Sequence, residues 1–162
     1  MTTALTLRRA TPDDCRQLWL WVNDSATRGA AFNSAEVPWP DHVAWFGARL
    51  ASARTTIFIA ETEDGTPVGQ VRFDLDPTGA AEVDVSLDPA WRGRRLAADL
   101  LRMAADMYSV DTSTALVAHV RPENVPSRRA FESAGFRDAG AECVNGHESI
   151  RYERKRDAPS WP

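Results

Sequence analysis

The chain has 162 residues, 43% of them hydrophobic, and a formal net charge of −4 at pH 7. These values are typical of one globular domain with a sizeable core. The acidic balance argues against nucleic acid as a partner, and no apolar run reaches the roughly 20 residues that a membrane span needs. The N-terminus lacks the regions of a secretion signal, and the spacing of Cys15 and Cys143 fits no metal-binding motif. We therefore expect a cytoplasmic protein with no metal site and no membrane partner.

The first third of the chain predicts one strand and two helices. Thr11 and Pro12 form a helix start, with Thr11 at the N-cap and Pro12 at the first helical position. Apolar residues at helical spacing follow in both helices, which suits helices that lie on a sheet. The expected elements are a strand at residues 5–9, a helix at 11–24, a loop at 25–38 and a helix from about 40 to 50.

From residue 55 onward the hydrophobic period changes to two, which predicts strands. Gly65 and Gly146 mark hairpin turns, and Gly135 stands where a helix ends. The expected elements are strands at 55–61, 67–75, 81–87 and 115–121, helices after 92 and at 124–134, and a hairpin of 136–144 with 148–154. The strand–helix–strand unit from 81 to 121 requires a right-handed crossover between parallel strands. The sequence therefore predicts an α/β fold of mixed α+β type, with a mixed sheet and helices on both faces.

The stretch from Glu82 to Leu101 carries the clearest chemical signal. It begins as an alternating strand, breaks at Asp88-Pro89, and passes through Arg92-Gly93-Arg94-Arg95 into an amphipathic helix. A basic, glycine-containing turn at a helix start offers free backbone N–H groups and a positive helix end. This pattern favours a ligand that bears a phosphate or a pyrophosphate.

Two segments together resemble the GNAT family of N-acetyltransferases. Arg92-Gly-Arg-Arg-Leu-Ala97 resembles the family's pyrophosphate loop, Arg/Gln-x-x-Gly-x-Gly/Ala, and Asn124 to Phe136 is similar to its second signature, Asn-x-x-Ser/Ala followed by Phe/Tyr-x-x-x-Gly-Phe. With the order of elements, the resemblance covers roughly residues 5–155. It implies the GNAT fold with a central sheet of six to seven strands, in one domain over 1–156 followed by a short tail at 157–162.

The resemblance implies acetyl-CoA as the cofactor and a pose for it. Strand backbone at 85–87 pairs with the pantetheine arm as an added strand does, and N–H groups at 93–97 hold the pyrophosphate. Asn124 contacts the pantetheine, and residues 127–131 flank the thiol. The implied cofactor-binding residues are Val85, Ser86, Leu87, Arg92, Gly93, Arg94, Arg95, Leu96, Ala97, Asn124, Ser127, Arg128 and Phe131.

Arg95 departs from the family pattern because it occupies a glycine position. Its backbone N–H remains available if its φ is negative. Its side chain either adds a phosphate contact or crowds the loop, and the sequence leaves both alternatives open.

Acetyl transfer to an amine requires a base that removes a proton, stabilisation of the oxyanion and reprotonation of the thiolate. Glu82 and Asp84 share the polar face of one strand, and His119 lies on the polar face of the neighbouring strand. We expect His119 and Glu82 to be the leading catalytic residues, acting directly or through water in a ternary complex. Asp84 is a weaker third candidate, and a hydrogen-bonded or ion-paired sheet residue is the alternative for each of them.

The proton donor to the thiolate is a gap in the pattern. Many relatives carry a tyrosine four residues before the glycine of Gly-Phe, where this chain has Phe131. Ser127, water or Tyr152 are the substitutes that the sequence offers, with no basis for choosing among them.

Residues 18–46 resemble the GNAT branch that acetylates nucleotide-linked amino sugars, such as the enzymes of the pseudaminic acid pathway. The shared pattern is Trp-x-Asn-Asp, then Arg, Phe and His-x-x-Trp-Phe, with the core anchoring of two helices as the alternative explanation for the aromatic residues. The implied acceptor-binding residues are Asn23, Arg28, Phe32, His42 and Trp45. We expect a small-molecule amine acceptor, an amino sugar, and leave open a protein or small-amine acceptor, an inactive CoA-binding module, and a monomeric or homodimeric state.

Overall fold

The computed structural model describes residues 3–109 and 114–155. The first part contains β1 (Leu5–Arg9), the 3-10 turn η1 (Pro12–Asp14), α1 (Cys15–Val22), α2 (Ser25–Ala30), α3 (Trp39–Ala51), β2 (Thr55–Thr62) and β3 (Pro67–Leu75). The second part contains β4 (Ala81–Leu87), the 3-10 turn η2 (Pro89–Trp91), α4 (Leu96–Ser109), β5 (Leu116–Val120), α5 (Val125–Ser133), β6 (Arg137–Val144) and β7 (His147–Arg154). None of the described helices is long and apolar enough to cross a membrane.

The described strands form one mixed sheet of seven strands in the order β1-β2-β3-β4-β5-β7-β6. Neighbouring strands are antiparallel except for the parallel pair β4 and β5. The helix α4 makes the crossover between these two strands, as expected for a parallel pair. The mixed sheet with helices on both faces, which we expected from the sequence, is confirmed.

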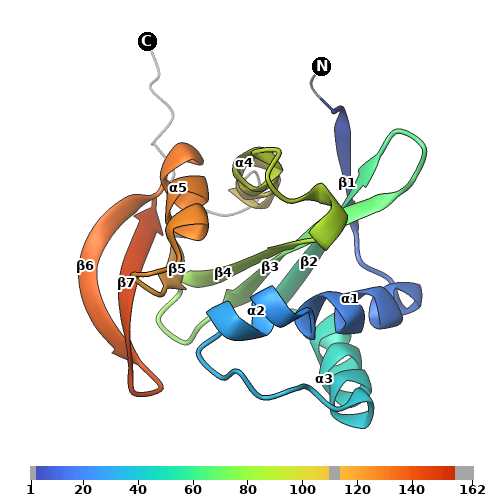
Figure 1. Cartoon of the computed structure of the whole chain (residues 1–162), viewed down its shortest axis with the longest axis horizontal. Coiled ribbons are helices and arrows are strands. Elements are labelled where there is room, and N and C mark those ends of the chain that lie inside the picture. Colours follow the sequence, from blue (N-terminus) through green and yellow to red (C-terminus); the bar gives the residue numbers. More distant parts are fainter. Residues whose placement is uncertain (1–2, 110–113, 156–162) are drawn as a thin grey trace.

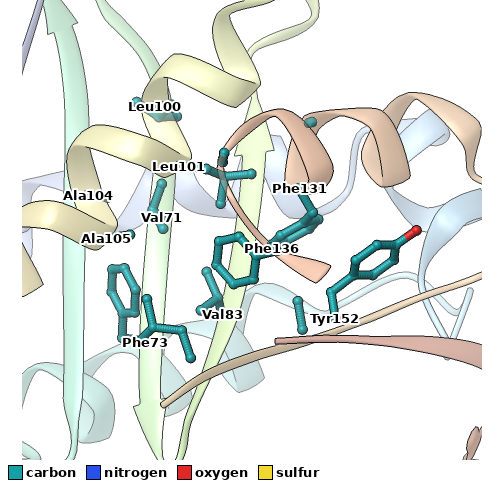
Figure 2. Close-up of a cluster of buried hydrophobic side chains, with 14 of the residues drawn as sticks. Val71, Phe73, Val83, Leu100, Leu101, Ala104, Ala105, Phe131, Phe136 and Tyr152 are labelled. Carbon is teal, nitrogen blue, oxygen red and sulfur yellow. The ribbon is translucent and has the colours of Figure 1, made fainter. Parts of the chain in front are cut away.

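Helices cover both faces of the sheet, with α4 and α5 on one side and α1, α2 and α3 on the other (Figure 1). The larger core lies under α4 and α5, where buried side chains from Leu100, Leu101 and Phe131 meet Phe73 and Val83 of the sheet (Figure 2). The smaller core lies on the opposite face and joins α1 and α3 to β2. The two faces of β4 and β5 therefore lie in different surroundings, one packed under α4 and the other turned toward the α2 side.

Two differences from the expected elements lie on the α2 side of the sheet. Residues 25–30, expected as loop, form the short helix α2, because the Asp24 side chain accepts a hydrogen bond from the backbone of Thr27 and caps its start. The first predicted helix begins as the 3-10 turn η1 before α1. The predicted tail at 157–162 lies outside the described residues.

Candidate functional site

The strands β4 and β5 pair at one end and part at the other. Their only paired positions are Ala81 with Leu116 and Glu82 with Val117. The Ala81 N–H donates to the carbonyl of Ala115 on the β5 side, at 2.9 Å. Because backbone groups alternate in direction along a strand, the N–H groups of Val83, Val85 and Leu87 point to this same side, where β5 has moved away. An extended ligand can therefore add to this edge as a strand does.

The direction of the backbone N–H groups along β4 refines the expected cofactor contacts on this strand. The backbone groups of Val85 and Leu87 face the parted edge, whereas those of Ser86 face β3, where Ser86 pairs with Gln70. The Ser86 hydroxyl also accepts a hydrogen bond from the Gln70 amide at 3.1 Å. Of the three predicted strand residues, two present backbone N–H groups to the parted edge.

The loop between η2 and α4 lies at the parted end of β4. Gly93 and Arg95 both have positive φ, +75° and +61°, and α4 begins directly after them at Leu96. The negative φ that we required of Arg95 is therefore not found, because this arginine occupies the left-handed conformation that glycine adopts without strain. Alternating left-handed residues turn successive backbone N–H groups toward one concavity, a geometry that binds anions.

The basic side chains of this loop have different surroundings. The Arg94 guanidinium lies over the Trp91 ring, 4.8 Å from its centroid, and Arg95 is exposed. The Arg92 guanidinium instead turns toward α2, where it forms an ion pair with Asp24 at 2.7 Å. Leu96 is buried in the core and Ala97 packs beside it, so these two residues contribute backbone only to an anion site.

The two leading catalytic candidates lie side by side. His119 Nδ1 is 3.3 Å from Glu82 Oε1, and its Nε2 is 2.8 Å from Oε2 of Glu142. The strands bring His119 and Glu82 together because β4 and β5 are still paired at Glu82. One imidazole is thus held between two carboxylates at the point where the strands begin to part. Asp84, the third candidate, is held by the Gln70 amide at 2.9 Å.

Glu142 is a residue of this site that the sequence did not indicate. It lies on β6, two strands away from β5, and crosses the intervening strand at Ser149, its register partner. Ser149 is fully buried, and its small side chain lets the glutamate pass over it to His119. Arg151 Nη1 lies 3.5 Å from Glu142 Oε1 and supports the carboxylate from the other side.

Beside this group, Arg121 of the segment after β5 contacts α2 and the loop that follows it, and we call these residues and the adjoining β6–β7 hairpin the rim of the site. The Arg121 guanidinium lies over the ring of Phe32, 5.8 Å from its centroid, and 3.5 Å from the carbonyl of Gly29. The Phe32 ring is in turn 6.4 Å from the ring of His147 in the hairpin. Phe32, a predicted acceptor-binding residue, therefore lies at the rim of the site.

The other predicted acceptor-binding residues have contacts within the fold. The side chain of Asn23 bonds the backbone N–H and carbonyl of Val37, at 2.8 and 2.9 Å. Arg28 donates to the carbonyl oxygens of Val22, Asn33 and Ala35. These two side chains hold the loop that follows α2, and Asn23 also lines a hollow beside α1.

His42 and Trp45 of α3 also contact the fold. His42 is buried, its Nε2 lies 2.8 Å from the carbonyl oxygen of Cys15, and its ring stacks on Phe46. Burial lowers the pKa of this imidazole, an effect that the Cys15 carbonyl partly offsets. Trp45 lies under the guanidinium of Arg72, 5.0 Å from the ring centroid. The interpretation of these side chains as packing residues, one of the two alternatives for the aromatic pattern, agrees with this geometry.

The second motif, residues 124–136, covers α5 and the turn that follows it. Asn124 Oδ1 accepts from the backbone of Ser127 at 3.3 Å and caps the helix. The Phe131 ring is buried against Phe136, with centroids 5.0 Å apart. The Arg128 side chain donates to the Tyr152 hydroxyl at 3.2 Å and to the carbonyl of Pro122 at 3.1 Å.

Tyr152 is fully buried and its hydroxyl donates to Glu132 at 2.9 Å. Figure 2 shows this hydroxyl under α5, on the far side of the Phe131 ring from the β4 backbone. Burial, with the hydrogen bond to Glu132, raises the pKa of this phenol against the opposing effect of Arg128.

A separate hollow of about 460 Å³ is lined by α1, Asp24 and Asp88 and contains neither His119 nor Glu82. We therefore define the candidate site by the parted strands and not by this hollow.

Comparison with known proteins assigns the class that this fold and site define. Residues 4–137 match the family model of the acetyltransferase (GNAT) domain. The match covers most of the chain, and the chain therefore belongs to the GNAT acetyltransferase family. The family resemblance stated from the two sequence motifs is confirmed at this level.

The individual relatives share 30% sequence identity or less with the chain. The chain is 30% identical to a mycothiol acetyltransferase of Corynebacterium diphtheriae in an alignment of 137 positions, which covers 76% of this chain but only 42% of that protein. It is 27% identical to a putative phosphinothricin acetyltransferase, YwnH, of Bacillus subtilis, over 84% of this chain and 86% of that one. Among solved structures, the aminoglycoside acetyltransferase AAC(6')-Ib with coenzyme A and kanamycin superimposes with a TM-score of 0.82 at 21% identity, covering 94% and 95% of the two chains. That likeness shows a shared fold.

Proposed function

We propose that the protein is an acetyl-CoA-dependent N-acetyltransferase that transfers the acetyl group directly to a primary amine. The observation that carries the proposal is the position of His119, held between Glu82 and Glu142 where β4 and β5 part. Family membership and the anion-binding geometry of the loop at 93–96 support it.

The residues of the parted edge fit the cofactor. The backbone of Val85 and Leu87 would hold the pantetheine arm, and the loop from Gly93 to the start of α4 would hold the pyrophosphate. Bound there, acetyl-CoA supplies the acetyl group as a thioester. Asn124 and Ser127 lie at the start of α5 and would border the arm, whereas Arg128 and Phe131 support the helix from within.

We propose a division of labour among His119 and the two carboxylates beside it, Glu82 and Glu142. A neutral imidazole donates through one nitrogen only, and we assign that role to Nε2, which makes the shorter contact, 2.8 Å to Glu142. Nδ1 then carries the lone pair and faces Glu82. A protonated amine placed between them would donate to both, so that Glu82 binds the ammonium and His119 takes the proton.

We infer that the acceptor is an amino sugar, and that the surroundings of His119 favour one with several amines over a nucleotide-linked one. The carboxylates of Glu82, Asp84 and Glu142 are 59%, 53% and 42% exposed on the same side of the sheet. Arg72 and Arg151 approach them at 3.7 and 3.5 Å, and Arg121 at the rim is 17% exposed. The more exposed carboxylates can bind the ammonium groups of a polycation. A linear polyamine is the second candidate, favoured by the same carboxylates.

The test is acetyl-CoA-dependent thiol release with a panel of amines. The panel contains kanamycin, glucosamine, a nucleotide-linked amino sugar, spermidine, phosphinothricin and a lysine peptide. We expect turnover with at least one amino sugar, and we expect His119→Gln to lower kcat/KM by about 10²- to 10⁴-fold. Glu82→Gln should lower kcat/KM as well, because it removes the carboxylate that binds the ammonium, whereas Glu63→Gln, at an exposed glutamate in the β2–β3 turn, is the matched control and should leave it unchanged. Tight CoA binding with no turnover on any amine would instead indicate an inactive CoA-binding module.

A further inference from the structure

A single guanidinium joins the loop of the proposed pyrophosphate site to α2. Arg92 Nη2 contacts Asp24 Oδ2 at 2.7 Å, the hydroxyl of Thr27 at 3.2 Å and the carbonyl of Leu87 at 3.1 Å. The side chains of Arg92 and Asp24 are 33% and 17% exposed, so the ion pair is largely shielded from water. The three contacts come from three segments: the helix cap, the helix α2 and the parted end of β4.

Asp24 has two roles at this junction. The same oxygen, Oδ2, accepts from the backbone N–H of Thr27 at 3.2 Å and so caps α2. Burial raises the pKa of the Asp24 carboxyl, but the hydrogen bond from Arg92 and those from Thr27 outweigh it and hold the pKa below its usual value. The start of α2 is thus set by a group whose other partner belongs to the loop after β4.

The rest of α2 determines the rim of the His119 site. Arg28 fixes the loop at 33–35 through its carbonyl contacts. The carbonyl of Gly29 contacts the Arg121 guanidinium, which in turn lies over the Phe32 ring. The start of α2 is therefore linked, over only six residues, to the residues that border His119.

We propose that Arg92 and Asp24 are a positioning pair that couples occupation of the pyrophosphate loop to the order of the acceptor rim. Arg92 acts through Asp24 on α2, and the backbone of its loop, rather than its guanidinium, meets the phosphates. Ordering of the loop by CoA then stabilises α2 and the segment 25–38. This inference rests on the proposed CoA site and concerns the acceptor side of that same site.

Hydrogen exchange tests the coupling without any acceptor. In the wild type we expect CoA to slow amide exchange across residues 25–38. Asp24→Asn keeps a good helix cap but removes the charge, so it should fold, bind CoA within about threefold of the wild type and lose the slowing at 25–38. Asp41→Asn, an exposed aspartate in the first turn of α3, is the matched control and should behave as the wild type.

Steady-state kinetics and a double-mutant cycle separate this role from others. Asp24→Asn and Arg92→Gln should each raise the acceptor KM about fivefold with a smaller change in kcat. The double variant should have an acceptor KM no higher than either single variant, and Arg92→Lys should recover part of the lost acceptor affinity. If Arg92 binds phosphate instead, Arg92→Gln weakens CoA at least tenfold while Asp24→Asn does not, and the proposal is overturned. Unchanged exchange at 25–38 in the wild type on adding CoA also overturns it, whether or not an acceptor is found. Failure of acetyl transfer alone refutes the enzymatic proposal and leaves this test in place.

Discussion

Replacing Arg95 with glycine should stabilise the protein. A non-glycine residue in the left-handed region costs about 1–2 kcal/mol, and Arg95 has φ of +61°. Glycine removes that cost, but its greater conformational freedom stabilises the unfolded chain by about 0.4–1 kcal/mol. Arg95 is exposed, so no packing is lost. The net expectation for Arg95→Gly is a free energy of unfolding higher by about 1 kcal/mol, and a Tm higher by about 2–4 °C.

Arg94→Gly is the matched control, since it removes the neighbouring arginine from a residue without positive φ. It loses the contact of the guanidinium with the Trp91 ring, worth about 0.5–1 kcal/mol, and also pays the cost of glycine in the unfolded chain. We expect it to lower the free energy of unfolding by about 1–2 kcal/mol. Urea unfolding and thermal melts of both variants measure the difference.

Calorimetric titration of CoA into the Arg95→Gly variant tests the second half of the reasoning. If backbone N–H groups hold the pyrophosphate, the affinity should stay within about threefold of the wild type, since glycine keeps the backbone conformation. A loss of tenfold or more would show that the Arg95 side chain is itself a phosphate ligand. A fall in stability equal to that of Arg94→Gly would refute the strain argument.

Three further substitutions test single contacts. Glu142→Ala should lower kcat about tenfold or more without changing the CoA affinity, because the His119 ring loses the partner at 2.8 Å that orients it; an unchanged kcat would contradict this role. Burial lowers the pKa of His42, so the unfolded chain binds a proton at this residue first as the pH falls through about 6.5. The contribution of neutral His42 to the free energy of unfolding is therefore complete above this pH and is lost below it. Urea midpoints at pH 7.5 and 5.5 should accordingly differ less in His42→Gln than in the wild type. Tyr152→Phe should lower stability by about 1 kcal/mol and leave kcat unchanged, since the hydroxyl bonds Glu132 and Arg128; a large fall in kcat would instead make it the thiolate's proton donor.

The order of elements could be predicted because each one carries a local signal. The strands at 67–75 and 81–87 have the bounds that their alternation predicts, and α5 ends at Ser133, just before Gly135, the predicted C′ residue, whose φ is +89°. The helix α2 was missed because its six residues are too few for a hydrophobic period, and its start depends on the capping side chain of Asp24. Local patterns thus predict elements that repeat a period and miss those that a single contact stabilises.

The same distinction between local patterns and single contacts applies to the candidate site residues. Glu82 and His119 could be paired from the sequence, because a crossover brings their strands together and alternation gives their faces. The predicted acceptor-binding residues Asn23, Arg28 and His42 follow from a motif of residue types, and residue type does not reveal that the fold bonds all three to its own backbone carbonyls. A polar side chain next to buried segments is a frequent partner for carbonyl groups that would otherwise lack one.

The position of Glu142 shows why the remaining part of the site has no sequence signal. Its contact with His119 depends on the register of β6 against β7, and that register shifts between Asp138 and Ala141, at Gly140 with φ of +110°. A shift of one residue would turn the glutamate to the other face of the sheet. The contact also requires a small side chain at Ser149, the partner of Glu142 on β7. A bulge and a buried serine, neither of which bears catalytic chemistry, therefore decide whether the imidazole has its second carboxylate.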